Sequence, residues 1–252
     1  MTDPTFPDHF SDRAAGYREY RPTYPRELVD FLADTSPGTA LAWEAGCGSG
    51  QLSVGLLERF DRVVATDASA EQLAHARRHE RIEYRRALAE DSGLPAHCAD
   101  LAVAAQAAHW FDLDAYYAEV KRVARRGAVI ALICYDLLSA GDDVDPIVSH
   151  FYREVLAPYW PPERRLVEAG YRTIPFPFEE IPAPALELHA DWTLEQLLGY
   201  ARTWSGVRAL EKARGPGAVE ALGEELAPLW GDGGKATRRI TWPLAMRVGR
   251  VG

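Results

Sequence analysis

The feature that most constrains the fold of this chain is a glycine-rich loop at residues 44–50. The loop has the sequence Glu-Ala-Gly-Cys-Gly-Ser-Gly and directly follows residues 39–43, a short apolar run that predicts a buried strand. Residues 51–59, which come next, predict a helix with its leucines on the inner side. Glycines let the backbone turn sharply and approach a ligand closely, and the start of a helix offers free N–H groups. This order predicts a ligand-binding turn in an α/β protein.

Strands and helices continue to alternate after the loop. The predicted strands cover residues 62–66, 82–86, 101–106 and 127–134, and the predicted helices cover residues 69–78 and 115–124. Ser69 with Gln72 three residues later can cap the first of these helices. Apolar strands separated by helices are typical of a parallel sheet with helices on both faces. The sequence therefore predicts an α/β fold, and it has no internal repeat.

Residues 136–190 differ in character, because prolines recur there among aromatic side chains. We expect an inserted helical cap, held by aromatic packing, over the end of the sheet. Residues 185–189 and 238–248 then predict strands, and residues 193–203 predict a helix. The predicted organisation is an N-terminal helical segment at 1–34, a ligand-binding core at 35–135, a cap at 136–184, and C-terminal strands and helices that complete the sheet at 185–252.

The overall composition excludes several classes of protein. A net charge of −9 argues against a broad surface for nucleic acid or acidic membrane. Three scattered cysteines and histidines without metal spacing predict neither a disulfide framework nor a metal site. The first twenty residues carry charges and no apolar core of a signal peptide, and the longest apolar run, at 128–135, cannot span a bilayer. We expect a cytoplasmic protein without metal, membrane or nucleic-acid partners.

Two positions beyond the glycines limit the class of ligand that the loop can bind. Residue 51 is Gln, so the dinucleotide pattern Gly-x-Gly-x-x-Gly fails when it is started at Gly46. Asp67 follows the next strand, where a carboxylate can accept hydrogen bonds from both hydroxyls of a ribose. The alternative for the loop is a tight strand–helix turn that holds no ligand. These residues favour a ribose-containing ligand other than a nicotinamide dinucleotide.

Six short motifs are spread over nearly the whole chain, most thinly across the cap. They are Tyr17-x-x-x-Arg21-Pro22-x-Tyr24-Pro25, residues 44–50, Ala65-Thr66-Asp67, Ala89-Glu90-x-x-x-Leu94-Pro95, Gln106-Ala107-Ala108-His109-Trp110-Phe111-Asp112 within residues 105–112, and Thr203-Trp204-Ser205. Together they resemble the class I S-adenosylmethionine-dependent methyltransferases, of the broad type 11 group that includes relatives of trans-aconitate and cantharidin methyltransferases. The resemblance implies a Rossmann-like seven-stranded sheet with helices on both faces and a helical cap. It also implies S-adenosylmethionine as cofactor and S-adenosylhomocysteine as product.

The resemblance assigns cofactor contacts residue by residue. Glu44, Gly46 and Gly48 would meet the methionine half of the cofactor, and Gln106 would lie near the same half. Asp67 would hold the ribose. The adenine would lie beside Ala68 and against Ala89 and Glu90. The loop that follows is one residue longer than usual, so whether Glu90 or Asp91 faces the adenine stays open.

The N-terminal motif allows a further cofactor contact. Tyr17 and Arg21 are four residues apart and would share one helix face. In the family this segment folds over the cofactor, so Arg21 could pair with the carboxylate of S-adenosylmethionine. The alternative is that Arg21 and Pro22 end a surface helix while Tyr17 packs on the core.

His109 is the candidate general base. It follows a predicted strand at the edge where ligands of open α/β sheets bind. A neutral imidazole there could take a proton from an acceptor oxygen. The alternative is a structural or cofactor-positioning role, with the histidine held at a packing corner. Trp110 and Phe111 are expected to belong to the core.

The expected reaction is methyl transfer to a small molecule, with a carboxylate or hydroxyl oxygen favoured as acceptor. A carboxylate needs no base and would be oriented by an arginine, whereas a hydroxyl would use His109 or a tyrosine. The candidate substrate contacts are Tyr20, Tyr159, Trp160 and Trp204, with Arg164, Arg165 and Arg202 as carboxylate binders or surface residues. Two other functions stay open: a nicotinamide-dependent oxidoreductase and a non-catalytic S-adenosylmethionine-binding protein.

Overall fold

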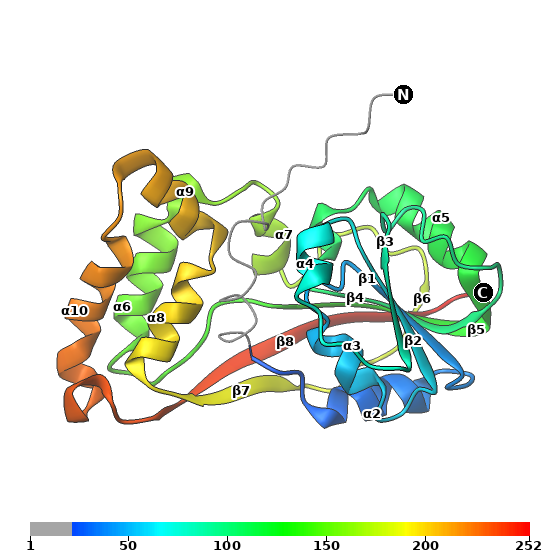
Figure 1. Cartoon of the computed structure of the whole chain (residues 1–252), viewed down its shortest axis with the longest axis horizontal. Helices are drawn as coiled ribbons and strands as arrows, with labels where there is room; N and C mark the ends of the chain where they lie inside the picture. The colour runs from blue at the N-terminus through cyan, green and yellow to red at the C-terminus, as the bar shows by residue number, and fades with distance from the viewer. Residues whose placement is uncertain (1–21) are drawn as a thin grey trace.

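The computed structural model describes residues 22–252, and these residues form a mixed sheet with helices on both faces and a helical cap at one end (Figure 1). The strands follow the order β3-β2-β1-β4-β5-β8-β6, and an eighth strand, β7, pairs with β8. Their bounds are β1 Leu41–Ala45, β2 Arg62–Asp67, β3 Ile82–Arg86, β4 Ala99–Ala105, β5 Ala124–Tyr135, β6 Glu179–Glu180, β7 Glu187–Trp192 and β8 Arg238–Arg250. The predicted Rossmann-like sheet is confirmed.

Strands β1 to β5 pair in parallel, so their carboxyl ends meet at one edge of the sheet. Strand β1 lies between β2 and β4. Strands β2 and β3 follow on one side of β1, and strands β4 and β5 follow on the other side, so the strand order reverses at β1. Such a switch point opens a crevice at the carboxyl ends, where ligands of open α/β sheets bind. The Trp43 indole donates a hydrogen bond of 3.0 Å to the Thr66 hydroxyl and joins the buried face of β1 to β2.

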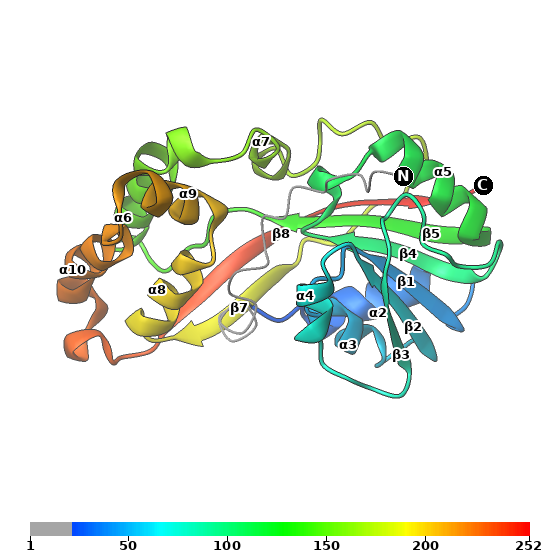
Figure 2. The ribbon, with the colours of Figure 1, turned by 45° about the horizontal axis from the view of Figure 1, so that its top comes forward.

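Helices cover the two faces of the sheet separately (Figure 2). One apolar cluster joins α2 (Arg26–Thr35) and α3 (Gln51–Leu56) to the sheet. A second cluster joins α5 (Leu113–Val123) and α7 (Arg164–Glu168) to the other face. The strands are buried on both faces for this reason, as their nearly continuous apolar sequence predicts.

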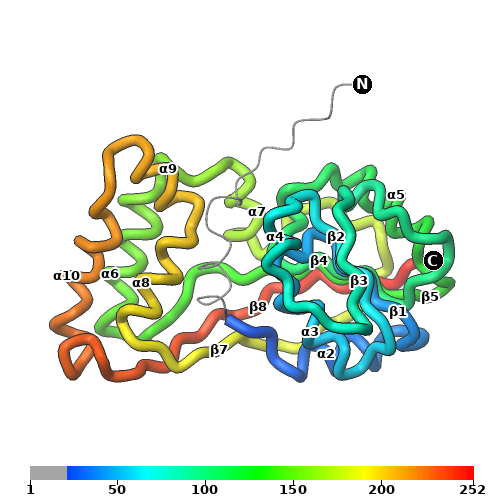
Figure 3. Tube along the Cα trace, viewed as in Figure 1, coloured from blue at the N-terminus to red at the C-terminus, as the bar shows by residue number. Residues whose placement is uncertain are grey.

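The cap is a third apolar cluster at the far end of β7 and β8 (Figure 3). It contains α6 (Asp145–His150), which continues as a π-helical turn, with α8 (Leu194–Arg202), α9 (Ser205–Arg214) and α10 (Ala218–Trp230). Aromatic rings dominate its centre: Trp192 and Trp242 lie 5.1 Å apart, and Tyr200 and Trp204 lie 5.6 Å apart between centroids. Residues 194–230 thus pack with α6 and with the β7–β8 end of the sheet.

Strand β8 joins the two parts of the molecule, because it pairs with β5 in the core and with β7 beside the cap.

Most predicted boundaries of strands and helices agree with the structure within three residues. The predicted helix over 69–78 is shorter, since α4 spans Ala70–Ala74, although Ser69 does accept a hydrogen bond from the Gln72 amide. Within residues 22–252, no helix is long and apolar enough to cross a membrane.

The cap provides a test of local stability at the start of α8. Thr193 and Gln196 form a reciprocal capping box there. We expect Thr193→Ala to lower the free energy of unfolding by about 1 kcal/mol, because an orphan helix amide loses its acceptor. Thr173→Ala, at an exposed turn, is the matched control and should change it by less than about 0.5 kcal/mol in the same denaturant titration.

Candidate functional site

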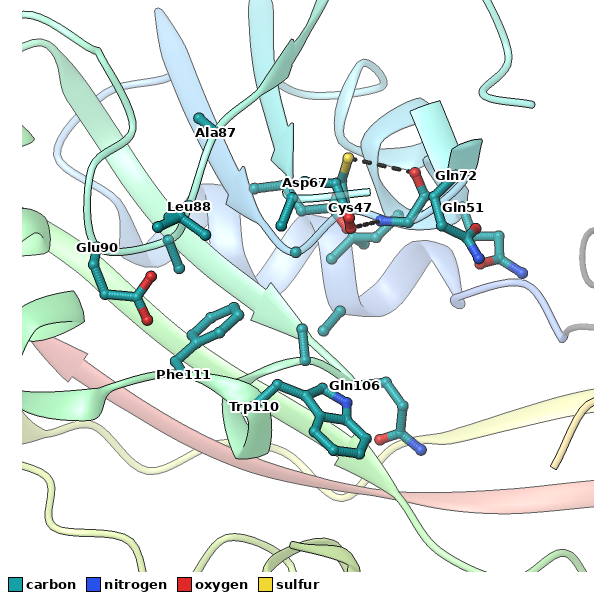
Figure 4. Close-up of a pocket in the computed structure, with 18 of the residues that line it drawn as sticks. Cys47, Gln51, Asp67, Gln72, Ala87, Leu88, Glu90, Gln106, Trp110 and Phe111 are labelled. Carbon is teal, nitrogen blue, oxygen red and sulfur yellow. Dashed lines mark hydrogen bonds between the residues drawn. The ribbon is translucent and has the colours of Figure 1, made fainter. Parts of the chain in front are cut away.

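A cavity of about 480 Å³ lies at the carboxyl edge of the parallel strands (Figure 4). It is lined by residues that follow β1, β2, β3 and β4, as expected at a switch point. Every predicted cofactor contact within the described residues lines this cavity: Glu44, Gly46, Gly48, Asp67, Ala68, Ala89, Glu90 and Gln106. The predicted contacts Tyr17, Tyr20 and Arg21 lie outside the described residues.

The glycine loop forms one wall of the cavity. Gly46, Gly48 and Gly50 all have positive φ angles, of 66°, 55° and 81°. A Cβ on Gly46 would lie 2.6 Å from the Cβ of Ala107, so the loop after β1 packs directly on the loop after β4. A Cβ on Gly48 would meet nothing closer than an atom at 3.8 Å, so this backbone borders open space. The loop therefore presents bare backbone to a ligand.

Asp67 is the acidic residue held most firmly at the cavity. Its Oδ2 accepts a hydrogen bond of 2.8 Å from the Gly48 amide, and its Oδ1 accepts one of 2.8 Å from the Ser69 amide. The Cys47 amide also donates to the Thr66 carbonyl, at 3.0 Å. These bonds fix the carboxylate between two loops.

Glu44 is a buried carboxyl group in the same wall. Its side chain is almost fully buried, and the Ser53 hydroxyl donates a hydrogen bond to it. Burial, with a further contribution from the nearby charge of Asp67, raises the pKa of Glu44 to about 8. Near neutral pH this carboxyl group therefore holds a proton for most of the time.

The loop after β3 forms the opposite wall of the cavity. It contains Glu90 and Asp91, the two acidic residues between which the sequence left the adenine contact open. Glu90 lines the cavity, and its Oε1 accepts a hydrogen bond of 2.8 Å from the Asp112 amide. Asp91 is not among the lining residues. The same loop is attached to α5, because Glu119 accepts a hydrogen bond of 2.9 Å from the Ser92 amide.

Leu88 is a wall residue that sequence analysis missed. Its side chain is 40% exposed, although it lines the cavity beside Glu90 (Figure 4). Its position one residue before the matched Ala89 was the available signal. Phe111 and Trp110, which we predicted to be core residues, also line the cavity. An apolar side of this kind suits a planar ring.

The charge of the cavity selects among ligands. Its lining contains the acidic side chains of Asp67, Glu90 and Asp112, the carboxyl group of Glu44, which is mostly protonated near neutral pH, and no lysine or arginine from residues 22–252. Carboxylates attract cations and hydroxyl or amino donors, and they repel a pyrophosphate. The described residues therefore fit S-adenosylmethionine, which carries a sulfonium, an ammonium, a ribose and an adenine, better than a dinucleotide.

A smaller pocket of about 60 Å³ adjoins the cavity, and Gln106 and Trp110 line both. Gln106 has a positive φ of 56°, and its side-chain amide donates to the Tyr135 carbonyl at 2.9 Å and accepts from the Tyr135 amide at 3.2 Å. These bonds hold the residue that separates the two spaces. Two predicted substrate contacts, Trp160 and Trp204, line the small pocket.

Tyr159, the other described substrate candidate, lies outside both linings, and the Arg214 guanidinium covers its ring at 5.7 Å. Arg165 is exposed, and Arg202 pairs with Glu220 at 2.9 Å. The cap therefore supplies Arg164 alone, of the three predicted carboxylate binders, to the lining of the small pocket.

Arg164 is held at the small pocket by aromatic rings and one carboxylate. Its guanidinium lies 5.1 Å from the ring centroids of both Tyr152 and Trp160, and its Nη2 lies 3.2 Å from Asp136. Asp136 also faces Arg153 at 3.6 Å, so two guanidinium groups share one carboxylate. The Nε of Arg164 is buried and has no acceptor within residues 22–252. This cation can bind a further anion.

His109 lines the small pocket beside Arg164. Its Nδ1 lies 2.8 Å from the Tyr171 hydroxyl. Burial, with a smaller contribution from the positive charge of Arg164, lowers the pKa of His109 to about 3. An efficient general base has a pKa near the working pH, so this environment favours the positioning alternative over proton abstraction.

Within residues 22–252, no group of three or more His, Cys, Asp or Glu side chains is arranged to hold a metal ion.

Comparisons with known proteins agree with this geometry. The family model described as a methyltransferase domain matches residues 43–132. A protein of Dictyostelium discoideum named as a methyltransferase is 31% identical over 251 residues, which cover 97% of this chain and 95% of that protein. A Saccharomyces cerevisiae protein named as an S-adenosylmethionine-dependent methyltransferase is 27% identical over 131 residues, 48% of this chain and 45% of that one.

A solved structure from Anaeromyxobacter dehalogenans, named as a type II methyltransferase, is 46% identical to this chain. It superposes with a TM-score of 0.86 and covers 92% of this chain and 98% of its own. The similarity therefore includes the cap as well as the sheet.

The raised pKa of Glu44 makes a prediction about stability. Because the folded pKa of about 8 lies above the ordinary 4.5, the folded protein binds this proton more tightly than the unfolded chain. The contribution is fully present below about pH 4.5 and is lost as pH rises toward 8, with a slope of at most about 1.4 kcal/mol per pH unit. Glu44→Gln should flatten the pH dependence of the free energy of unfolding in this window. Glu224→Gln, on the exposed side of α10, should leave the slope as in the wild type.

Proposed function

This chain belongs to the S-adenosylmethionine-dependent methyltransferases, and we propose that it transfers a methyl group to an oxygen of a small molecule, with a carboxylate as the favoured acceptor. The observation that carries the proposal is that the large cavity and the small pocket, which differ in charge, meet at Gln106 and Trp110. An acidic cavity suits the cationic methyl donor, and a small aromatic pocket with a guanidinium suits an anionic acceptor.

S-Adenosylmethionine supplies an electrophilic methyl group on a positively charged sulfur. In our proposal the bare backbone at Gly46 and Gly48, with Glu44 beneath it, holds the amino-acid end, and Asp67 accepts the ribose hydroxyls. Ala68, Ala89 and Glu90 contact the adenine. The fixed orientation of Asp67 by two backbone amides supports its assignment, because no reorganisation is needed when a ligand donates to it.

The choice of a carboxylate over a hydroxyl follows from the bases available. A hydroxyl must lose its proton during methyl transfer, and the neutral, low-pKa His109 is a poor acceptor for that proton. Asp136, the carboxylate in the small pocket, is already engaged by Arg153 and Arg164. A carboxylate acceptor is ionised at neutral pH and needs neither group as a base.

The protein's own contribution is then alignment and exclusion of water. Holding two reactants in line converts a bimolecular step into an effectively unimolecular one. Trp160 and Trp204 line the small pocket, in which we place the acceptor, and their rings would shield the reacting oxygen from solvent. Arg164 would hold the acceptor through one or two charge-assisted hydrogen bonds. The small size of this pocket favours a small molecule over a nucleic acid or a membrane as partner.

A labelled-cofactor experiment tests the proposal. The purified protein is incubated with methyl-labelled S-adenosylmethionine and a metabolite extract, with heat-inactivated protein as control. We expect label in a low-molecular-weight product that releases labelled methanol in mild base, as a methyl ester does. A base-stable product would contradict the carboxylate assignment. Tight cofactor binding without any transfer would favour the non-catalytic alternative.

Asp67→Ala tests the placement of the ribose. We expect the substitution to weaken S-adenosylmethionine binding by about 1–3 kcal/mol, because hydroxyls that enter the cavity lose their acceptor. Isothermal titration calorimetry measures the change. Asp61→Ala, at the exposed opposite end of β2, is the matched control. Equal affinities for the two variants would contradict the placement.

Arg164→Gln tests the acceptor side. We expect kcat/KM for the identified acceptor to fall about 10- to 100-fold, the usual cost of losing a charged hydrogen-bond donor. Cofactor affinity should stay within about twofold of the wild type, since Arg164 does not line the cofactor cavity. Arg165→Gln, one residue along the same helix and exposed, should leave both quantities unchanged. A similar loss in both variants would argue against a specific anion site.

A further inference from the structure

We propose that Tyr171 is a positioning residue that fixes His109 in its Nε2-protonated form, so that the ring presents an N–H donor to the acceptor pocket. The inference rests on the proposed function, because it assigns a role to His109 toward the acceptor. In this role His109 donates a hydrogen bond to the acceptor and does not take a proton from it.

The Tyr171 hydroxyl has one proton, and its surroundings decide where that proton points. The residue is fully buried, and its hydroxyl oxygen lies 2.8 Å from Nδ1 of His109. Within the described part of the chain, no other acceptor bonds this hydroxyl. Most buried hydroxyl groups donate their proton to an acceptor, and Nδ1 is the acceptor within hydrogen-bond distance, so we assign the Tyr171 proton to a bond with Nδ1.

This bond selects the tautomer of the imidazole. A neutral imidazole has one donor and one acceptor nitrogen, and Nδ1 is the acceptor here. The proton therefore resides on Nε2, the nitrogen left for the small pocket that the ring lines. Burial and the charge of Arg164 keep the ring neutral across the physiological range of pH. His109 thus offers a fixed donor beside a guanidinium.

Helix α7 and the turn after it bring Arg164 and Tyr171 to the surroundings of His109. Arg164 begins this helix, and Tyr171 follows its end after Gly170. Gly170 and Tyr171 both have φ angles of 58°, a conformation that a bulky residue rarely adopts. The Tyr171 amide donates to the Leu166 carbonyl at 2.9 Å, which closes the turn. The strained turn directs the phenol to His109, and such strain persists only where the surrounding structure holds it.

An NMR measurement tests the tautomer without any substrate. In protein labelled with ¹⁵N in its histidines, long-range proton–nitrogen correlations distinguish Nδ1-H from Nε2-H rings, and the His109→Gln spectrum identifies the His109 signals. We expect a single Nε2-H form that does not titrate between pH 5 and 8. An Nδ1-H ring, or a mixture, in the wild type would overturn the proposal, and this holds even if variants of Tyr171 fail to fold.

Tyr171→Phe should convert the His109 signals to a mixture of tautomers. Tyr117→Phe is the matched control, because the Tyr117 hydroxyl donates to the Pro175 carbonyl at 2.7 Å and is not bonded to His109. It should leave those signals unchanged. A Tyr171→Phe spectrum like that of the wild type would overturn the positioning role. Because these spectra need no acceptor, they separate this inference from a failure of the proposed function.

Kinetics with an identified acceptor complete the test. We expect Tyr171→Phe to lower kcat/KM about tenfold in the wild type and less than about twofold in a His109→Ala background, since a residue that acts through another loses its effect when that partner is removed. His109→Gln, which keeps an N–H donor, should retain more activity than His109→Ala. Equal losses from Tyr171→Phe in both backgrounds would show a purely structural role.

Discussion

The hydrogen bond from the Gly48 amide to Asp67 is the interaction on which the functional site depends. It joins the loop after β1 to the end of β2, beside the backbone bond from Cys47 to Thr66. The glycine loop makes this bond with a left-handed backbone at Gly46, Gly48 and Gly50. One short contact therefore orients the carboxylate, fixes the loop and leaves bare backbone at the edge of the cavity.

The second constraint is the separation of charge between two adjoining spaces. The cofactor cavity carries carboxyl groups and no cation from the described residues, whereas the small pocket contains Arg164, its partner Asp136 and a neutral imidazole. A cationic methyl donor and an anionic acceptor would each find the opposite charge, and they would meet at Gln106. That residue is held in a strained conformation by both backbone groups of Tyr135, which keeps the boundary between the two spaces in place.

The cap is attached to the sheet through β8 rather than simply inserted above it. Strand β8 pairs with β5 at one end and with β7 at the other, and the aromatic cluster packs around the β7 end. Helix α7, between cap and core, supplies Arg164 to the small pocket, and the turn that follows it supplies Tyr171 to His109. The acceptor pocket is thus built from segments that are far apart in the sequence, and the chemistry of the acceptor depends on how they are held together.

The sequence alone determined the order of strands and helices in the core, the glycine loop and the position of Asp67, because these follow from local periodicity and from backbone requirements of a few neighbouring residues. Their arrangement at one edge of a parallel sheet was predictable from the same pattern. Only the tertiary structure decided that Glu90 rather than Asp91 faces the cavity, that Arg164 rather than Arg165 or Arg202 reaches the small pocket, and that Tyr171 bonds His109. Each of these depends on contacts between residues distant in the chain. The burial of His109 also depends on the packed molecule and not on the motif in which the histidine lies. This burial lowers the pKa of His109 below that of an accessible imidazole.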